Sequence, residues 1–427
     1  TISGTSTAET GQTVTVTLNG ATYSGNVQAD GSWSVSVPPS ALGALSASNY
    51  TVSATVNDKA GNPGSASHNL AVDTTAPVLT INTVAGDDII NDAEHAQALV
   101  ISGTSTGGEA GDVVSVVLNG KTYTTTLDAS GNWSVGVPAA DVAALGSGAQ
   151  TITASVSDRA GNSDDASRTV TVSLSAPVIS INTIAGDDVI NATEKGSNLA
   201  LSGTSDQPAG TAITVTLNGQ NYSATTDASG NWSVTVPASA VSALGEATYS
   251  VTASVSNAQG NSSTASHNVQ VNTALPGVTI NPVTTDDIIN AAEAGSAQTI
   301  SGQVTGAAAG STVTVELGGK TYTATVQADL SWNVSVPAAD WQALGNGELT
   351  VNVSVTNAVG NTGSGTRDIT IDASLPGLRV DTVAGDDVVN IIEHAQAQVI
   401  TGSSSGFAAG TALTVVINNQ TYAATVL

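Results

Sequence analysis

Residues 86–94, with the sequence GDDIINDAE, hold the densest group of potential metal ligands in the chain. The segment places Asp87, Asp88, Asp92 and Glu94 within eight residues and contains no Lys or Arg. Carboxylates at such close spacing repel one another unless a cation neutralises them, and Ca²⁺ prefers hard oxygen ligands of this kind. This segment, which we call the acidic loop, therefore predicts part of a calcium site.

The acidic loop occurs four times, at intervals of 100, 99 and 100 residues. Each copy has two adjacent Asp residues, an Asn and a Glu, and the later copies are Asp187, Asp188, Asn191 and Glu194; Asp286, Asp287, Asn290 and Glu293; and Asp386, Asp387, Asn390 and Glu393. Any single Asp is explained equally well by turn formation, because Asp and Asn close Asx turns. Turn formation does not require an Asp pair followed by a Glu, so calcium binding is the favoured interpretation.

Two further positions recur in each repeat and offer oxygen ligands. The linker that leaves a repeat carries Asp73, Ser173, Asn272 or Asp372. A second loop, which ends in Gly-Asn and which we call the Gly-Asn loop, begins at Asp58, Asp158, Asn257 or Asn357. Asp73, Asp158 and Asp372 are therefore added to the calcium candidates, whereas the neutral residues at these positions are expected to weaken binding.

Zinc binding and catalysis are not indicated. The chain has no Cys, and its four His are scattered along the sequence. A zinc site needs several such ligands close together. His95 and His394, which follow acidic loops, are therefore expected at the surface rather than as metal ligands. No grouping of Ser, His and Asp suggests nucleophilic catalysis, and the Gly-rich segments lack the Lys of a phosphate-binding loop. We therefore do not expect an enzyme.

The balance of charges narrows the range of partners. The chain has 8 Lys and Arg against 34 Asp and Glu, which gives a formal net charge of −26. Such a charge repels nucleic-acid phosphates and anionic lipids but attracts divalent cations. No apolar run approaches the roughly 18 residues that a membrane-spanning helix needs. Nucleic-acid binding and membrane insertion are therefore not expected.

The segments between the loops have the pattern of β-strands. Apolar residues alternate with Thr and Ser, as in 14–18 (VTVTL) and 33–37 (WSVSV), which is typical of strands with one buried face. Within one period we expect strands near 78–84, 98–104, 112–119, 121–127, 132–137, 150–157 and 166–173. Seven short strands in about 100 residues predict an all-β, immunoglobulin-like sandwich.

The period divides the chain into five repeats. We expect a partial first repeat at 1–75, which lacks its first strand; complete repeats at 76–174, 175–273 and 274–373; and a partial fifth repeat at 374–427, which lacks its C-terminal strands. The segment 138–146 predicts one helical turn between two strands. A Trp recurs at 33, 133, 232 and 332 and is expected to anchor each core rather than to form a sugar-binding platform.

Strand directions predict where the loops lie. Because successive strands alternate in direction, the acidic loop and the departing linker are expected at one end of a repeat, and the Gly-Asn loop at the other. Repeats joined end to end into an elongated rod would then bring the acidic loop and linker of one repeat against the Gly-Asn loop of the next. Neighbouring repeats of the same chain are thus expected partners, with Ca²⁺ making each joint rigid.

The repeat also resembles a known family. The motifs are the segment 76–91, which includes Ala-Pro-Val and Ala-Gly-Asp-Asp, the Gly-Asn-Trp-Ser-Val of 131–135, and the Ala-Gly-Asn of 160–162, with their copies. These are similar to the bacterial Ig-like repeats of giant biofilm-associated, RTX-type adhesins of Gram-negative bacteria. The resemblance implies type I secretion, an extracellular location at the bacterial cell surface, calcium-stiffened stalks, and roles in biofilm formation and cell adhesion.

The same resemblance implies that Asp87, Asp88, Glu94 and their equivalents, and the linker residues Asp73 and Asp372, are calcium ligands. Two functional hypotheses follow. In the first, the chain is a structural extender of a large adhesin, whose other segments contact cell-surface or matrix ligands. In the alternative, the repeats themselves bind carbohydrate or host and partner-cell ligands through strand faces rich in Thr and Ser.

Overall fold

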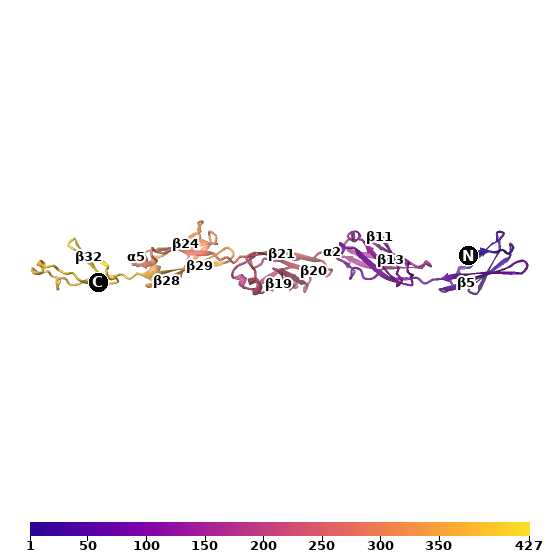
Figure 1. Cartoon of the computed structure of the whole chain (residues 1–427), viewed down its shortest axis with the longest axis horizontal. Coiled ribbons are helices and arrows are strands. Elements are labelled where there is room, and N and C mark those ends of the chain that lie inside the picture. The colour runs from indigo at the N-terminus through magenta and orange to yellow at the C-terminus, as the bar shows by residue number, and fades with distance from the viewer. The chain divides into compact units, whose positions relative to one another are not determined.

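The computed structural model describes residues 1–427 and consists mainly of β-strands with a few short helical turns (Figure 1). The chain forms two compact units, one of residues 1–178 with 254–264, and the other of residues 179–253 with 265–427. A sandwich of two sheets recurs within both units. No helix is long and apolar enough to cross a membrane.

The first unit holds the first two repeats. The first repeat comprises β1 (Ile2–Thr5), β2 (Thr13–Leu18), β3 (Ala21–Asn26), β4 (Ser32–Val35), α1 (Pro39–Leu42), β5 (Ser48–Asn57) and β6 (Pro63–Val72). The second comprises β7 (Val78–Leu79), β8 (Ile89–Ile90), α2 (Asp92–His95), β9 (Leu99–Thr106), β10 (Val113–Leu118), β11 (Lys121–Thr126), β12 (Asn132–Val137), α3 (Ala139–Val142), β13 (Gly148–Ser157) and β14 (Ser163–Val172). The sheets of the second repeat have the orders β12-β9-β7 and β11-β10-β13-β14-β8.

The second unit holds most of the third repeat and the two that follow. The third repeat comprises β15 (Val189–Ile190), η1 (Glu194–Gly196), β16 (Leu199–Thr204), β17 (Ala212–Leu217), β18 (Gln220–Thr225), β19 (Asn231–Val236), α4 (Ala238–Ser242), β20 (Thr248–Ser256) and β21 (Ser262–Val271). The fourth comprises β22 (Gly277–Ile280), β23 (Ile288–Asn290), α5 (Ala291–Ala294), β24 (Gln298–Thr305), β25 (Thr312–Leu317), β26 (Lys320–Thr325), β27 (Ser331–Val336), α6 (Ala338–Ala343), β28 (Gly347–Thr356) and β29 (Thr362–Asp372).

The fourth repeat has the same two sheets as the second, in the orders β22-β24-β27 and β23-β29-β28-β25-β26. In the fifth repeat, β30 (Gly377–Val380) pairs with β31 (Gly402–Ser405), and β32 (Ala412–Ile417) pairs with β33 (Gln420–Thr425). The helical turn η2 (Glu393–Ala395) lies between the first two of these strands. The all-β immunoglobulin-like fold predicted from the sequence is confirmed.

The alternation of side chains decides which face of each strand is buried. In β10, Val114, Val116 and Leu118 are buried, and the residues between them are more exposed. Ile152 and Val156 of the neighbouring strand β13 are buried on the same face. Because successive side chains of a strand point to opposite faces, a period of two places Val114, Val116 and Leu118 toward the facing sheet.

The recurring Trp is a core residue, as predicted. Trp133, Trp232 and Trp332 are at most 3% exposed. Space beside the ring is provided by a glycine: a Cβ built on Gly103 would lie 1.9 Å from the backbone oxygen of Thr80 and 2.6 Å from the Trp133 ring. Three segments therefore approach too closely at this point for any residue larger than Gly.

The first strand differs from the prediction. β7 is only two residues long and pairs antiparallel with β9, whereas β8 pairs parallel with β14 in the opposite sheet. The chain crosses between the sheets through a turn in which Ala85, Gly86 and Asp88 have φ angles of 54°, 95° and 65°. Strand directions therefore do not simply alternate, because the first strand is divided between both sheets. This crossing turn is the beginning of the acidic loop.

Candidate metal centre: the acidic loops and the segments they meet

The carboxylates of the Asp pair hold the acidic loop in its turn. Val84 N donates a hydrogen bond to Asp88 Oδ1, and Ile89 N donates one to Asp87 Oδ1, both at 3.0 Å. Equivalent bonds recur at the other pairs, which are Asp187 with Asp188, Asp286 with Asp287, and Asp386 with Asp387. The Asp pair thus has a structural role in every copy, in addition to its predicted calcium ligation.

In the second repeat, the second Asp of the pair faces a cation from its own repeat. Arg168 of β14 donates from Nε to Asp88 Oδ1 and from Nη2 to Asp88 Oδ2, both at 2.6 Å. Its Nη1 donates to Ile81 O at 2.9 Å. A planar guanidinium that binds both carboxylate oxygens is a strong and directional partner. The positive charge beside Asp88 is therefore an arginine that lies 80 residues away in the sequence.

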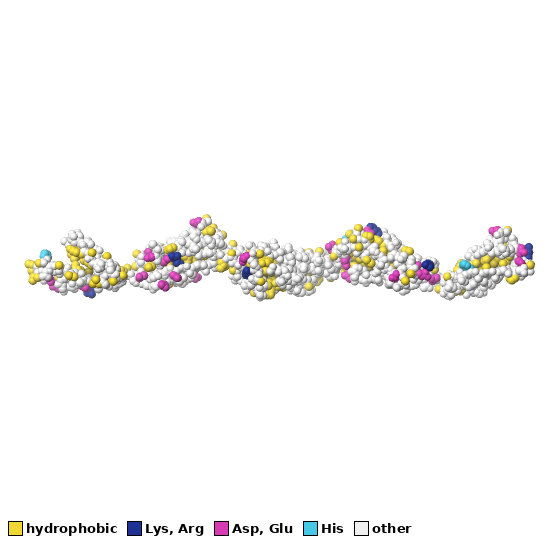
Figure 2. All heavy atoms as spheres, in the orientation of Figure 1, with side chains coloured by type: hydrophobic (Ala, Val, Ile, Leu, Met, Phe, Trp, Pro, Cys, Tyr) yellow, Lys and Arg dark blue, Asp and Glu magenta, His cyan; other side chains and the backbone are white.

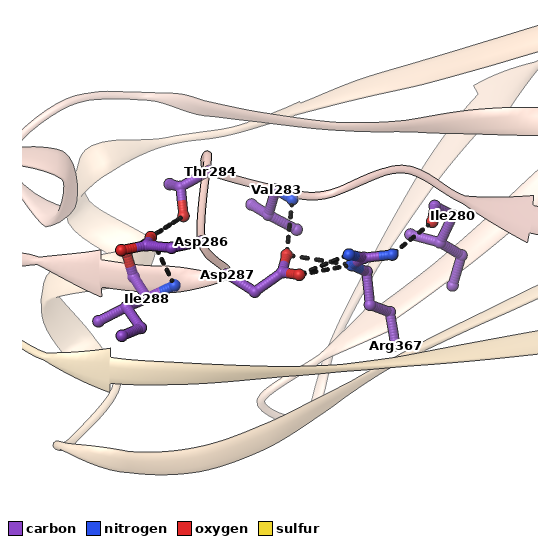
Figure 3. A network of polar contacts seen from close by, with 7 residues as sticks. All are labelled: Ile280, Val283, Thr284, Asp286, Asp287, Ile288 and Arg367. Carbon is purple, nitrogen blue, oxygen red and sulfur yellow. Dashed lines mark hydrogen bonds and ion pairs between the residues drawn. The ribbon is translucent and has the colours of Figure 1, made fainter.

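Arg367 of β29 binds Asp287 in the same way. Its Nε lies 3.0 Å from both carboxylate oxygens, and its Nη1 donates to Ile280 O at 2.9 Å. Figure 3 shows Asp287 pointing toward the guanidinium, whereas the neighbouring Asp286 points away from it, toward Thr284 and the backbone N–H of Ile288. The two members of an Asp pair therefore face different surroundings.

In the third repeat a histidine takes the place of the arginine. His267 Nε2 lies 2.7 Å from Asp188 Oδ1. The pKa of Asp188 is lowered, mainly by the hydrogen bond from Ile184 N and then by His267. Arg168 likewise lowers the pKa of Asp88, and Arg367 that of Asp287.

The expectation that an Asp pair needs a divalent ion to coexist is therefore wrong for the pairs that include Asp88 and Asp287. An arginine from the same repeat supplies the positive charge there. The role of these residues as calcium ligands stays a prediction. The first Asp of each pair is exposed, at positions 87, 187, 286 and 386.

The Glu of the acidic loop closes a capping box. Glu94 N donates to Asn91 Oδ1, and Asn91 N donates to Glu94 Oε2, both at 3.1 Å, at the start of α2. The same reciprocal bonds join Asn191 with Glu194, Asn290 with Glu293, and Asn390 with Glu393. Asn followed three residues later by Glu is a sequence signal for a helix start, and it recurs in all four acidic loops. The spacing of the Glu is thus set by a helical turn.

In the first unit, the acidic loop, the linker and a Gly-Asn loop meet at one buried amide. Asp92 N donates to Asn261 Oδ1 at 2.7 Å, and Asn261 Nδ2 donates to Ser173 O at 2.8 Å. Asn261 is 3% exposed. Its own backbone N donates to Asn257 Oδ1 at 2.9 Å, which closes the loop. The prediction that these three segments meet is confirmed at this place.

The second unit contains the same arrangement one repeat later. Ala192 N donates to Asn361 Oδ1 at 2.7 Å, and Asn361 Nδ2 donates to Asn272 O at 2.8 Å. Asn361 is 2% exposed, and its backbone N donates to Asn357 Oδ1 at 2.9 Å. Because the same bonds form in both units, the arrangement is a property of the repeat.

The contact between the first linker and the Gly-Asn loop of the second repeat carries two acidic residues, Asp73 and Asp158. Asn162 Nδ2 donates to Asp158 Oδ2 at 2.9 Å and to Asp73 O at 3.3 Å. The hydrogen bond from the Asn162 side chain is the main cause of the lowered pKa of Asp158. In the fourth repeat the linker residue Asp372 lies in register with Asn290 of the acidic loop. At both places carboxylates lie beside loop oxygens, which are the ligand types that calcium prefers.

Nowhere in the chain do three or more His, Asp or Glu side chains come together as a group that could hold a metal ion. Calcium takes six to eight oxygen ligands, which include backbone and amide carbonyls and water. A calcium ion bound near Asp73 and Asp158, or near Asp372, would therefore draw part of its coordination from the backbone and from water.

Comparisons with known proteins identify the repeats. The bacterial Ig-like domain family matches residues 1–74, 79–174 and 175–273. The chain is similar to a Ca²⁺-stabilised adhesin with which an Antarctic bacterium reaches out and binds ice, with 38% identity over 87% of this chain and 93% of that chain and a TM-score of 0.45. None of the curated proteins compared with the chain is significantly similar to it.

Two further solved structures are similar. One concerns the surface retention of a 1.5-MDa bacterial ice-binding adhesin and has 33% identity over 71% of this chain and 100% of that chain, with a TM-score of 0.41. The other is a tetra-tandem repeat from the extending region of a large adhesion protein, with 26% identity over 87% of this chain and 95% of that chain and a TM-score of 0.37. The three matched stretches together make up more than half of this chain, so the chain belongs to the bacterial Ig-like domain family.

Proposed function

We propose that this chain is a structural extender segment of a large calcium-binding bacterial adhesin and holds a binding module away from the cell. Its likeness to the extending region of a large adhesion protein supports this role. The observation that carries the proposal is the recurring contact in which an acidic loop, a linker and a Gly-Asn loop share one buried Asn, Asn261 or Asn361. A built contact of this kind between successive repeats is what an extender needs.

Calcium binding is proposed where an acidic linker residue meets a loop that carries carboxylates. Asn162 Nδ2 joins the Asp158 carboxylate to the backbone oxygen of Asp73, and Asp372 lies in register with Asn290 of the acidic loop that contains Asp286 and Glu293. Like charges at close range repel, and a divalent ion that binds both sides removes the repulsion and restricts the motion of linker and loop. The remaining carboxylates of the acidic loops are additional ligand candidates.

The proposal extends to the cellular role. We propose that the adhesin leaves the cell by type I secretion, is displayed at the bacterial cell surface and contributes to biofilm formation and cell adhesion. The likeness to a surface-retained ice-binding adhesin supports this location. Sugar binding on the recurring Trp is not part of the proposal, because Trp133, Trp232 and Trp332 are buried and offer no aromatic surface to a sugar.

Small-angle scattering and calorimetric titration of the whole chain test the proposal. We expect saturable Ca²⁺ binding and a larger maximum dimension in Ca²⁺ than in chelator. Asp73→Asn with Asp158→Asn should reduce the number of bound ions. Asp165→Asn with Glu348→Gln is the matched control, because it removes the same charge from exposed strand positions. A chain that binds no Ca²⁺ and has equal dimensions in both conditions would contradict the calcium role, and saturable glycan binding would support the alternative.

A further inference from the structure

The linker and the Gly-Asn loop change their charge together. The linker residue and the first residue of the loop that it meets are Asp73 with Asp158, Ser173 with Asn257, and Asn272 with Asn357. A carboxylate on one side is matched by a carboxylate on the other, and a neutral side chain by a neutral one. The chain therefore contains two chemical kinds of contact between successive repeats, one acidic and one neutral.

In the neutral contacts the oxygens that calcium would need are already bound by N–H groups. Asn261 Oδ1 accepts from Asp92 N at 2.7 Å, and Ser173 O accepts from Asn261 Nδ2 at 2.8 Å. A primary amide offers both a donor and an acceptor, and Asn261 uses both here. A calcium ion would have to share each of these oxygens with the N–H group that already binds it, and neither the linker residue nor the first loop residue adds a carboxylate at these contacts. The donor set at the neutral contacts therefore does not fit the metal.

Burial strengthens this conclusion. Asn261 and Asn361 are 3% and 2% exposed, which places them among the few buried polar side chains of the chain. A buried amide is stable only when its hydrogen bonds are made, and here both ends of each amide are bound. The structure thus uses the amide as the bridging group between the acidic loop and the linker.

At these contacts the second Asp and the Glu of each acidic loop already have partners within their own repeat. Asp88 is bound by Arg168, and one oxygen of Glu94 closes the capping box. At the second neutral contact, Asp188 lies beside His267, and Glu194 caps its own turn. Carboxylates at both places are thus engaged within their own repeat.

A glycine lets the two loops approach each other. Gly260 has φ 85°, and a Cβ built on it would lie 2.9 Å from Asn91 Nδ2. Gly360 has φ 82°, and its Cβ would lie 3.0 Å from Asn191 Nδ2. The neutral contacts are therefore closely packed as well as hydrogen-bonded.

We propose that the contacts made by Asn261 and Asn361 are amide latches that hold without calcium, whereas the contact of Asp73 with Asp158 depends on it. The inference builds on the proposed extender role and limits the calcium dependence to the acidic contacts. An array of this kind has permanently closed contacts next to contacts that respond to calcium.

Distances between spin labels test the latches. Because the chain has no Cys, Thr122→Cys with Asn221→Cys places two unique labels on either side of the Asn261 contact, and Asn221→Cys with Thr321→Cys does so for Asn361. All three positions are exposed and occupy equivalent places in β11, β18 and β26. We expect a narrow distance distribution for both pairs that is the same in Ca²⁺ and in excess chelator. Broadening of either distribution in chelator would overturn the inference.

Two variants of the Asn361 contact give opposite expected results. Asn361→Ala removes the bridge, so the Asn221 and Thr321 labels should lose their narrow distribution in both conditions; a distribution that stays narrow would contradict the latch. Asn272→Asp with Asn357→Asp converts the contact to the acidic kind, so the distribution should become narrow in Ca²⁺ and broad in chelator. The Asn261 contact, measured with the other label pair in each variant, is the internal control.

The same measurements separate this inference from the proposed calcium role. If the Asp variant stays unresponsive to calcium while the unmodified contacts stay narrow, the latches are supported and the calcium role of acidic contacts is rejected. If instead the unmodified contacts broaden in chelator, calcium acts at every contact and the latch inference fails.

Discussion

Asp88 and Arg168 show how a distant residue changes the interpretation of a local motif. The sequence places Asp88 in a group of carboxylates without a cation, and this pattern predicts a calcium site. In the fold, β14 runs beside β8 and brings the guanidinium of Arg168 to both oxygens of Asp88. The partner is 80 residues away, so no local pattern could reveal it. The capping box of Asn91 and Glu94, by contrast, is visible in the sequence.

The ion pair predicts a dependence of stability on pH. We expect Asp88→Asn to lower the free energy of unfolding of the second repeat by about 1–2 kcal/mol near neutral pH, since the pair is charged and bidentate but 28% exposed on each side. The pKa of Asp88 is lowered in the folded state. The contribution is therefore fully present above the unfolded pKa, near 4, and is lost as the pH falls through the folded pKa.

Urea unfolding of the chain with and without Asp88→Asn, measured from neutral pH down through the acid range, checks this prediction. The difference in stability should shrink as the pH falls. Asp165→Asn is a control at an exposed strand position and should change stability little at any pH. A difference between Asp88→Asn and the unmodified chain that does not vary with pH would contradict the assignment.

Glu293 has two candidate roles that one pair of substitutions separates. Gln can take the place of Glu in a capping box, so Glu293→Gln should retain stability, whereas Glu293→Ala should cost about 1 kcal/mol. If Glu293 is also a calcium ligand near Asp372, both substitutions should weaken calcium binding. Urea unfolding in chelator measures the first role, and calcium titration measures the second. Equal stability of the Glu293→Gln and Glu293→Ala variants would contradict the capping role.

Strands and loops differ in how far the sequence determines them. The period of two in β10 and β13 depends only on local residues, so the strands and the buried Trp could be predicted. β8 is two residues long and pairs with a strand about 80 residues later, so it gives no local signal. The meeting of the loops was still predicted correctly, because β8 runs parallel to β14. The acidic loop and the linker therefore leave the repeat at the same end.

The close approach of β9 to the first strand predicts a sensitive glycine. Gly103→Ala would place a Cβ 1.9 Å from Thr80 O and 2.6 Å from the Trp133 ring. We expect a loss of about 3 kcal/mol, at the upper end of the range for overpacking. Gly136→Ala in β12 is the matched control, because a Cβ there has nothing within 4 Å. Thermal or urea unfolding should show a second repeat that is destabilised only by the first substitution, and equal effects of both would contradict the packing argument.

The molecule as a whole combines a high negative charge with a mostly uncharged polar surface. Figure 2 shows Asp and Glu side chains scattered over this surface, with Lys and Arg at few places. The net charge of −26 is therefore spread over many repeats rather than gathered in one patch. A surface of this kind favours solubility and divalent cations over nucleic acid. Changes at only a few positions, such as those of Asp73, Ser173 and Asn272, then suffice to vary the contact between one repeat and the next.

The parallel pairing of β8 with β14 has a mechanical consequence. When a repeat is pulled by its two chain ends, β8 is drawn in one direction and β14 in the other, so the strands must slide past each other in shear. The bonds from Thr171 N to Asp88 O at 2.8 Å and from Ser173 N to Ile90 O at 3.0 Å are then loaded together rather than broken one after another. A load applied along the repeat would thus act on a pairing whose geometry resists rupture.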